Sequence, residues 1–229
     1  MKTLGLIGGI GPESTVEYYR FITEAFRDQC DGNYPPIIIN SVNLKMFIRL
    51  LNANEMQKFA DELVREVERL AVAGADFGAF ASNTPHIVFD EVNRRSRIPL
   101  VSIVEATRDR AIELGFKKVG LLGTRFTMQG TFYPEVFSRA GLDLIAPNDE
   151  EQAYIHDKYM NELLNNVFAP ATRDHMIEIA NSMKQREGVE ALILGGTELP
   201  ILLRDSTQAR MPLLDTTRIH VDRLVSLMV

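Results

Sequence analysis

Two short polar segments contain the side chains that could do chemistry. Ser82-Asn83-Thr84 lies shortly before His86, and Gly196-Thr197-Glu198 lies near the end of the chain. Hydroxyl and amide groups can hold a carboxylate, and a serine can move a proton when a neighbouring base activates it. Chemistry on a small carboxylate is therefore the first hypothesis for these segments.

The elements that must position these segments are strands and helix starts. Each segment follows an apolar run, 77–81 or 192–194, and each is followed closely by a proline, Pro85 or Pro200. This order is typical of a buried strand that hands its end to a helix N-terminus, where free backbone N–H groups attract anions. Open α/β sheets bind ligands at such strand ends.

The two segments belong to a longer internal repeat. Gly196 follows Ser82 by 114 residues, and Gly120 follows the similarly placed Gly5 by 115. Two pairs of strand ends at nearly the same offset indicate duplication. We therefore expect two similar α/β halves whose polar corners face each other across a cleft.

Strands and helices alternate throughout, which predicts parallel sheets with right-handed crossovers. Apolar runs predict strands at 4–8, 36–40, 77–81, 98–103, 119–122, 142–145, 192–194 and 211–215. Spacing and capping signals predict helices from 12, over 56–71, from 84, and over 149–166, 172–186 and 218–228. A loop at 41–43 and a variable polar segment precede the second of these helices. The predicted domains are 1–102 plus 210–229, and 103–209, with the cleft between them.

The glycine-rich turn Gly8-Gly9-Ile10-Gly11 has two interpretations. A dinucleotide site would need a third glycine in the fingerprint and an acid about 20 residues further on, and neither is convincing here. The alternative is a tight turn that lines a small-ligand pocket. This places Ile10 among the candidate substrate-binding residues.

Composition excludes several classes of protein. The 229 residues are 45% hydrophobic and 24% charged, as in ordinary globular proteins, and the net charge of −6 argues against nucleic-acid or anionic-membrane binding. Cys30 is the only cysteine, so the sequence offers neither an intrachain disulfide nor a cysteine metal cage. No apolar run approaches the ~18 residues of a membrane span. A soluble, cytoplasmic protein is expected.

Five motifs together resemble the aspartate/glutamate racemase family over nearly the whole chain. They are the segments 5–15, 82–86, 122–128, 195–198 and 214–216. The resemblance implies two Rossmann-like three-layer α/β/α domains related by a pseudo-two-fold axis. It also implies a cofactor-free enzyme, usually a homodimer, that acts on small carboxylates in the cleft between the domains.

The chain departs from the family pattern at both catalytic positions. The usual family pattern has a cysteine just before Asn-Thr and another just before Thr-Glu, one thiol for each face of the substrate, although some relatives have a hydroxyl residue at the first position. Thiols, with an ordinary pKa of about 8.5, can be tuned to remove and return the α-proton. Here these positions are Ser82 and Gly196, and Gly196 has no side chain to act as acid or base.

The candidate catalytic residues are consequently Ser82, His86 and Glu198. Either His86 or Glu198 could activate the Ser82 hydroxyl. The alternatives are that Ser82 is only a helix N-cap and that His86 is a polar residue packed on the corner helix.

The candidate binding residues would hold the carboxylates of the substrate. Asn83, Thr84 and Thr197 supply donors for the α-carboxylate, with Ile10 and Gly196 beside them. A side-chain carboxylate would also need a cation, for which we select Arg49, in the region where relatives place substrate-selecting residues. The alternative for Arg49 is a solvated arginine at a helix start.

Two functions follow from this pattern. The first is an amino-acid racemase-type isomerase that abstracts the α-proton of aspartate, glutamate or a related carboxylate without a cofactor. The second is a family offshoot that binds a dicarboxylate without racemisation, or acts as a lyase or decarboxylase.

Overall fold

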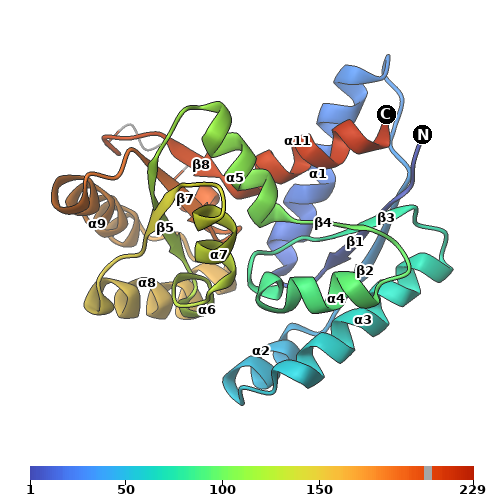
Figure 1. The fold of residues 1–229 in the computed structure, drawn as a ribbon, viewed down its shortest axis with the longest axis horizontal. Coiled ribbons are helices and arrows are strands. Elements are labelled where there is room, and N and C mark those ends of the chain that lie inside the picture. Colours follow the sequence, from blue (N-terminus) through green and yellow to red (C-terminus); the bar gives the residue numbers. More distant parts are fainter. Residues whose placement is uncertain (204–207) are drawn as a thin grey trace. The chain divides into compact units, whose positions relative to one another are not determined.

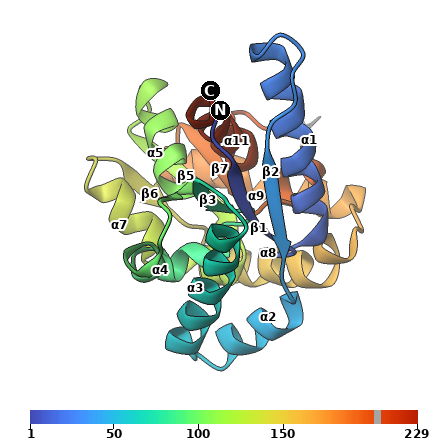
Figure 2. The same ribbon diagram turned by 90° about the vertical axis from the view of Figure 1, so that its right-hand side faces the viewer.

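The computed structural model describes residues 1–203 and 208–229, and the chain forms two compact units (Figures 1 and 2). Unit 1 consists of Met1–Ile103 and His220–Val229, and unit 2 consists of Val104–Ile219. The predicted boundaries assign 210–219 to the first domain, whereas these residues belong to unit 2. The reason is that strand β8 (Leu213–Asp215) pairs with strand β7 (Ala191–Gly195).

Each unit contains one four-stranded sheet in which every pairing is parallel. In unit 1 the order is β2-β1-β3-β4, and in unit 2 it is β6-β5-β7-β8, so the second sheet repeats the order of the first. The strands of unit 1 are β1 (Leu4–Gly8), β2 (Ile37–Ser41), β3 (Phe77–Phe80) and β4 (Leu100–Val101). Those of unit 2 are β5 (Lys118–Gly123), β6 (Asp143–Ile145), β7 and β8. The predicted α/β class with parallel sheets is confirmed.

Helices connect successive strands in both units. Those of the first segment of unit 1 are α1 (Pro12–Gln29), α2 (Leu44–Asn52), α3 (Met56–Val72), the short 3-10 helix η1 (Thr84–Val88) and α4 (Phe89–Arg95). They are followed by α5 (Ile103–Glu113), α6 (Arg125–Met128), α7 (Phe132–Ser138), α8 (Asp149–Asn161), η2 (Leu163–Asn165), α9 (Pro170–Glu187) and α10 (Leu199–Leu203). The last helix is α11 (Thr216–Met228).

Helix α2 corrects the sequence analysis, which predicts a loop and a polar segment there. Asn43 caps this helix, because its side chain accepts from the backbone N–H of Met46 at 3.3 Å. Phe47, Leu50 and Leu51 form its buried side at helical spacing. Six of its nine residues are apolar, so the prediction of a polar segment overlooks a pattern that the sequence itself displays.

Helix α11, near the end of the chain, completes the core of unit 1. Val221, Leu224, Val225 and Met228 of α11 belong to the same buried cluster as residues of β1, β3 and α1. His220 adds a polar link, because Nδ1 lies 2.8 Å from the Tyr18 hydroxyl and Nε2 lies 3.2 Å from Val101 O.

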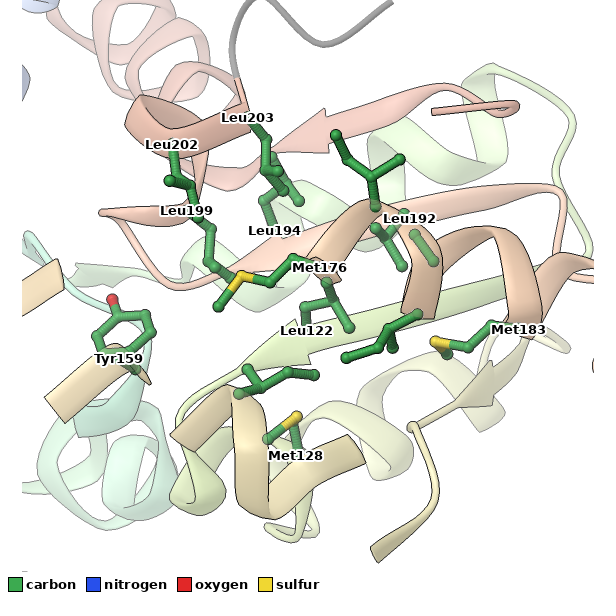
Figure 3. Close-up of a cluster of buried hydrophobic side chains, with 14 of the residues drawn as sticks. Leu122, Met128, Tyr159, Met176, Met183, Leu192, Leu194, Leu199, Leu202 and Leu203 are labelled. Atoms are coloured by element: carbon green, nitrogen blue, oxygen red, sulfur yellow. The ribbon is translucent and has the colours of Figure 1, made fainter. Parts of the chain in front are cut away.

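The core of unit 2 surrounds β5 and β7. The leucine and methionine side chains labelled in Figure 3 come from these strands and from helices α6, α9 and α10. Within the described residues, no helix has the length and apolar character needed to cross a membrane.

Candidate active site

The first candidate corner lies at the carboxyl ends of the paired strands β1 and β3 in unit 1. The Ser14 hydroxyl ties the loops after these strands together, since it lies 2.7 Å from Gly11 O and 3.2 Å from Ala81 O. This contact brings the loop that contains Ile10 next to the loop that contains Ser82. Both loops follow directly from the parallel pairing of the strands.

Glycine is required at position 9 of this corner. Gly9 has φ of +84°, and a Cβ there would lie 2.6 Å from Val42 O and 2.7 Å from Ser41 Oγ. Its backbone N–H donates to Thr15 Oγ1 at 2.8 Å. The turn is therefore fixed between the loop after β2 and the first turn of α1, and its conformation alone requires a glycine at position 9.

Ser82 and Asn83 are buried, and Thr84 is half-buried at the start of η1. Asn83 occupies the N-cap position of η1, so the alternative role of Ser82 as N-cap is wrong. Across residues 1–203 and 208–229, the Ser82 hydroxyl has no hydrogen-bond partner. It can donate to or accept from a ligand.

His86 is held by backbone groups at both ring nitrogens. Nδ1 lies 3.1 Å from Asn83 O, and Nε2 accepts from the Ile103 N–H at 3.2 Å. The ring stacks on Phe89, with centroids 5.0 Å apart. Burial lowers the pKa of His86 to about 3, so the ring is neutral and donates through Nδ1. The backbone, rather than the Ser82 hydroxyl, therefore engages both nitrogens.

Arg49 lies in the last turn of α2, not in a loop, and its side chain is exposed. In the described part of the chain it forms no ion pair and no side-chain hydrogen bond. Because Asn43 caps α2 directly after β2, the helix follows the carboxyl end of that strand. Arg49 is therefore a cation that a carboxylate could recruit.

The second candidate corner, Gly196-Thr197-Glu198, joins β7 to α10 in unit 2, and all three residues are buried. Thr197 Oγ1 donates to Glu198 Oε2 at 3.0 Å, and the hydroxyl of Tyr159 donates to the same oxygen. Only 2% of Glu198 is exposed. A buried carboxylate at a strand end is thus stabilised by two hydroxyl donors.

Tyr159 is the residue at this corner that the sequence analysis misses. It lies on α8 four residues from Ile155 and from Leu163, and all three belong to the buried cluster of unit 2. Such spacing predicts an ordinary core position. Figure 3 shows Tyr159 at one end of that cluster, with its hydroxyl oxygen at the ring tip. The only sequence signal is the missing side chain of Gly196, which indicates that another residue fills the space without indicating which.

The environment of Tyr159 keeps its hydroxyl protonated. Burial, followed by the neighbouring Glu198 carboxylate, raises the pKa of Tyr159 well above its ordinary value of 10. The phenol is therefore neutral near pH 7 and acts as the donor. Together the two residues hold a proton and a carboxylate within hydrogen-bond distance.

Each unit thus brings together part of the candidate set. The loops of unit 1 place Ile10, Ser82, Asn83 and Thr84 at neighbouring strand ends, with Arg49 apart on α2. The corner of unit 2 places Gly196, Thr197 and Glu198 beside Tyr159. In the described residues, no group of three or more His, Cys, Asp or Glu side chains could hold a metal ion.

Solved structures share this fold along the whole chain. A racemase candidate of the Asp/Glu type from Yersinia pestis has a TM-score of 0.90 and 32% identity, covering 100% of this chain and 99% of that one. An aspartate racemase homologue from Pyrococcus horikoshii has a TM-score of 0.85 and 35% identity, with the same coverage. The fold is that of the racemase-like two-unit α/β proteins.

Sequence comparisons define the family. The broad specificity amino-acid racemase RacX of Bacillus subtilis is 25% identical over 221 residues, which are 93% of this chain and 92% of that protein. The model of the Asp/Glu/Hydantoin racemase family matches residues 7–224. The chain belongs to this family, as the motifs of its sequence indicate.

Proposed function

We propose that this protein is an amino-acid racemase-type isomerase. Its substrate is aspartate, glutamate or a related small carboxylate, and its reaction is cofactor-independent removal and return of the α-proton. The observation that carries the proposal is the occurrence of buried proton-transfer groups at equivalent strand ends of two repeated sheets. One end carries the Ser82 hydroxyl, and the other carries the Glu198 carboxylate.

The binding roles follow from the donors at each corner. Asn83, Thr84 and Thr197 hold the α-carboxylate of the substrate, and the backbone near Ile10 and Gly196 lines the site. Arg49 pairs with the side-chain carboxylate, which accounts for an exposed arginine without an ion pair among the described residues.

The catalytic roles are divided between the two faces of the substrate. Ser82 acts on one face as the acid that gives its hydroxyl proton to the carbanion, and water returns a proton to its oxygen, because the hydroxyl has no protein partner in the described chain. Glu198 supplies the base for the other face. His86 fixes the loop of Ser82, because its ring nitrogens are bonded to backbone groups on both sides.

A second candidate function has support in the replaced cysteines. Ser82 is a poorer acid and base than a thiol, and Gly196 offers no side chain. A protein with this site could hold a dicarboxylate without racemising it, or could act as a lyase or decarboxylase, which needs fewer bases. A homodimer and a cytoplasmic location stay predictions from family resemblance.

Proton NMR in heavy water tests the proposal. The purified protein is incubated with L- and D-aspartate, L- and D-glutamate and related dicarboxylates, and the α-proton signal is followed. We expect the signal to disappear with at least one of them, and Ser82→Ala to slow inversion about 100-fold or more, in the range of a lost acid or base.

Retention of every α-proton would refute the racemase and favour the second candidate. Ser82→Ala should leave the melting temperature within a few degrees, since the lost hydroxyl has no hydrogen-bond partner in the described chain. This control separates loss of chemistry from loss of fold.

A further inference from the structure

Tyr159 fills the place where a side chain of residue 196 would stand. A Cβ built on Gly196 would overlap Cε2 of the Tyr159 ring, and it would lie 2.6 Å from the hydroxyl oxygen and 2.8 Å from Cζ. Any side chain at position 196 would therefore need Tyr159 to move. Only 4% of Tyr159 is exposed, and its hydroxyl is bonded to Glu198, so the ring has little freedom to do so.

The overlap also brings a reactive group, the Tyr159 hydroxyl, close to position 196. The thiol of a cysteine at position 196 would lie one bond beyond Cβ, and the Tyr159 oxygen lies 2.6 Å from that Cβ position. The phenol thus presents an O–H group close to the point where the relatives' second cysteine would present its thiol. The Tyr159 ring therefore occupies the space that the side chain of a cysteine at position 196 would need.

The geometry points to Tyr159 as the second proton-transfer residue of this protein, with Glu198 as the carboxylate that takes up its proton. This assignment rests on the proposed racemase function and supplies the acid/base group that Gly196 lacks. Tyr159 would contact the reacting α-carbon, and Glu198 would act through Tyr159.

The substrate, Tyr159 and Glu198 account for every proton that moves in this step, so no further reactant is needed. In one direction the Cα–H bond of the substrate breaks as its proton moves to the Tyr159 oxygen, while the phenol proton moves to Glu198 Oε2. The electron pair of the broken bond stays on the substrate as the carbanion. In the other direction protonated Glu198 returns its proton to Tyr159, which delivers its own proton to the α-carbon.

The other buried tyrosines show what distinguishes Tyr159. The Tyr18 hydroxyl is bonded to a histidine ring, and the side chain of Tyr133 is bonded to Thr107. Tyr159 is bonded to a carboxylate, which can accept its proton. Tyr133 lies in the same unit and is fully buried, so it is the matched control for removal of a buried hydroxyl.

The test is the heavy-water exchange assay on Tyr159→Phe, Tyr133→Phe and Glu198→Gln. Phenylalanine keeps the ring against Gly196, so the fold should survive. We expect Tyr159→Phe to slow inversion at least 100-fold in kcat with little change in KM. Tyr159→Phe should still exchange the α-proton of the enantiomer whose α-hydrogen faces Ser82. Ser82→Ala should instead exchange only the α-proton of the other enantiomer.

Glu198→Gln is expected to reproduce the enantiomer-selective loss, and it gives a second test if Tyr159→Phe does not fold. Inversion by Tyr159→Phe within threefold of the wild type would overturn the assignment, as would equal losses in Tyr159→Phe and Tyr133→Phe. An inactive wild-type protein would refute the proposed function first, and the role of Tyr159 with it. Failure of the proposed function is thus seen in the wild-type protein, and failure of the Tyr159 assignment is seen in the Tyr159→Phe variant.

Discussion

Gly196 and Tyr159 are in contact, and a double-mutant cycle can measure the energy of this contact. We expect Gly196→Ala to lower the free energy of unfolding by about 1 to 3 kcal/mol, because the new Cβ would meet the buried Tyr159 ring. The same substitution in a Tyr159→Leu background should lower it by less than about 1 kcal/mol, since the ring and hydroxyl are gone. Urea denaturation of the four proteins gives the coupling energy.

Equal effects of Gly196→Ala in both backgrounds would contradict the packing described here. The same contact bears on any attempt to restore the family cysteine. Gly196→Cys in the wild-type background would place its side chain against Tyr159, so it is not expected to raise activity unless position 159 is also made smaller.

The two buried histidines of unit 1 should make stability depend on pH. Burial lowers the pKa of both His86 and His220 from 6.5 to about 3, and for His220 the nearness of His86, which would repel a second proton, is a further cause. Below pH 6.5 the unfolded chain binds protons that the folded chain does not bind. The free energy of unfolding should therefore fall as the pH drops from about 6.5 toward 3, by at most about 1.4 kcal/mol per pH unit for each histidine.

Urea denaturation between pH 7 and pH 5 measures this slope before most carboxylates titrate. His220→Gln should make the slope shallower, because one proton-binding difference disappears. His175→Gln is the control, since that ring is exposed at the surface. An unchanged slope in His220→Gln would contradict the burial of a neutral ring at this position.

At the scale of elements, helix α11 should be as important to unit 1 as its own strands. Leu224 is fully buried in the cluster with β1, β3 and α1, whereas the neighbouring Arg223 is exposed. We expect Leu224→Ala to lower the free energy of unfolding by about 2 to 5 kcal/mol, and Arg223→Ala by less than about 0.5 kcal/mol. Similar effects of both substitutions in thermal denaturation would contradict this packing.

Elements also show how far the sequence alone can lead. Most strands are predicted because they are apolar runs that end at glycine or small polar residues, as at Gly8 and Ser82. The run 98–103 is an exception, since only Leu100–Val101 form β4 and Ile103 already begins α5. Helix α2 is missed because the segment after Asn43 is interpreted as polar, although Phe47, Leu50 and Leu51 stand at helical spacing in it. The capping residue Asn43 was the available signal.

The candidate corners follow from sequence because they lie within a few residues of a recognisable strand end. Tyr159 does not, because its partner Glu198 is 39 residues away and the contact is made by packing of α8 against the end of β7. In the same way, the backbone bonds of His86 to Asn83 and Ile103 depend on the folded loops. Sequence patterns predict where polar groups gather, and only the fold decides which of them meet.

At the scale of the whole molecule, unit 1 should depend on the last ten residues and unit 2 should not. Removal of residues 220–229 takes away four apolar side chains that are at most 2% exposed. Their burial contributes about 1.5 to 3 kcal/mol each, a sum comparable with the total stability of a domain, about 5 to 15 kcal/mol. Hydrogen exchange followed by mass spectrometry should show lost protection in β1, β3 and α1, with protection kept in β5 and β7.

Deletion of Val229 alone is the control, since this residue is 71% exposed. Equal loss of protection in both units after removal of 220–229 would show that the units do not unfold separately. Unchanged protection in unit 1 would show that α11 is dispensable for its core.

The return of α11 to the first unit also sets an order for folding during synthesis. Unit 2 is one continuous stretch, so all of it leaves the ribosome before the residues that complete unit 1. The N-terminal segment of unit 1 cannot complete its core until α11 leaves the ribosome. Until then, the apolar surface around Tyr18 and Phe77 is exposed. In a nascent chain, unit 2 can therefore be folded while the N-terminal segment of unit 1 is still incomplete. That segment is the part that would need a chaperone's protection.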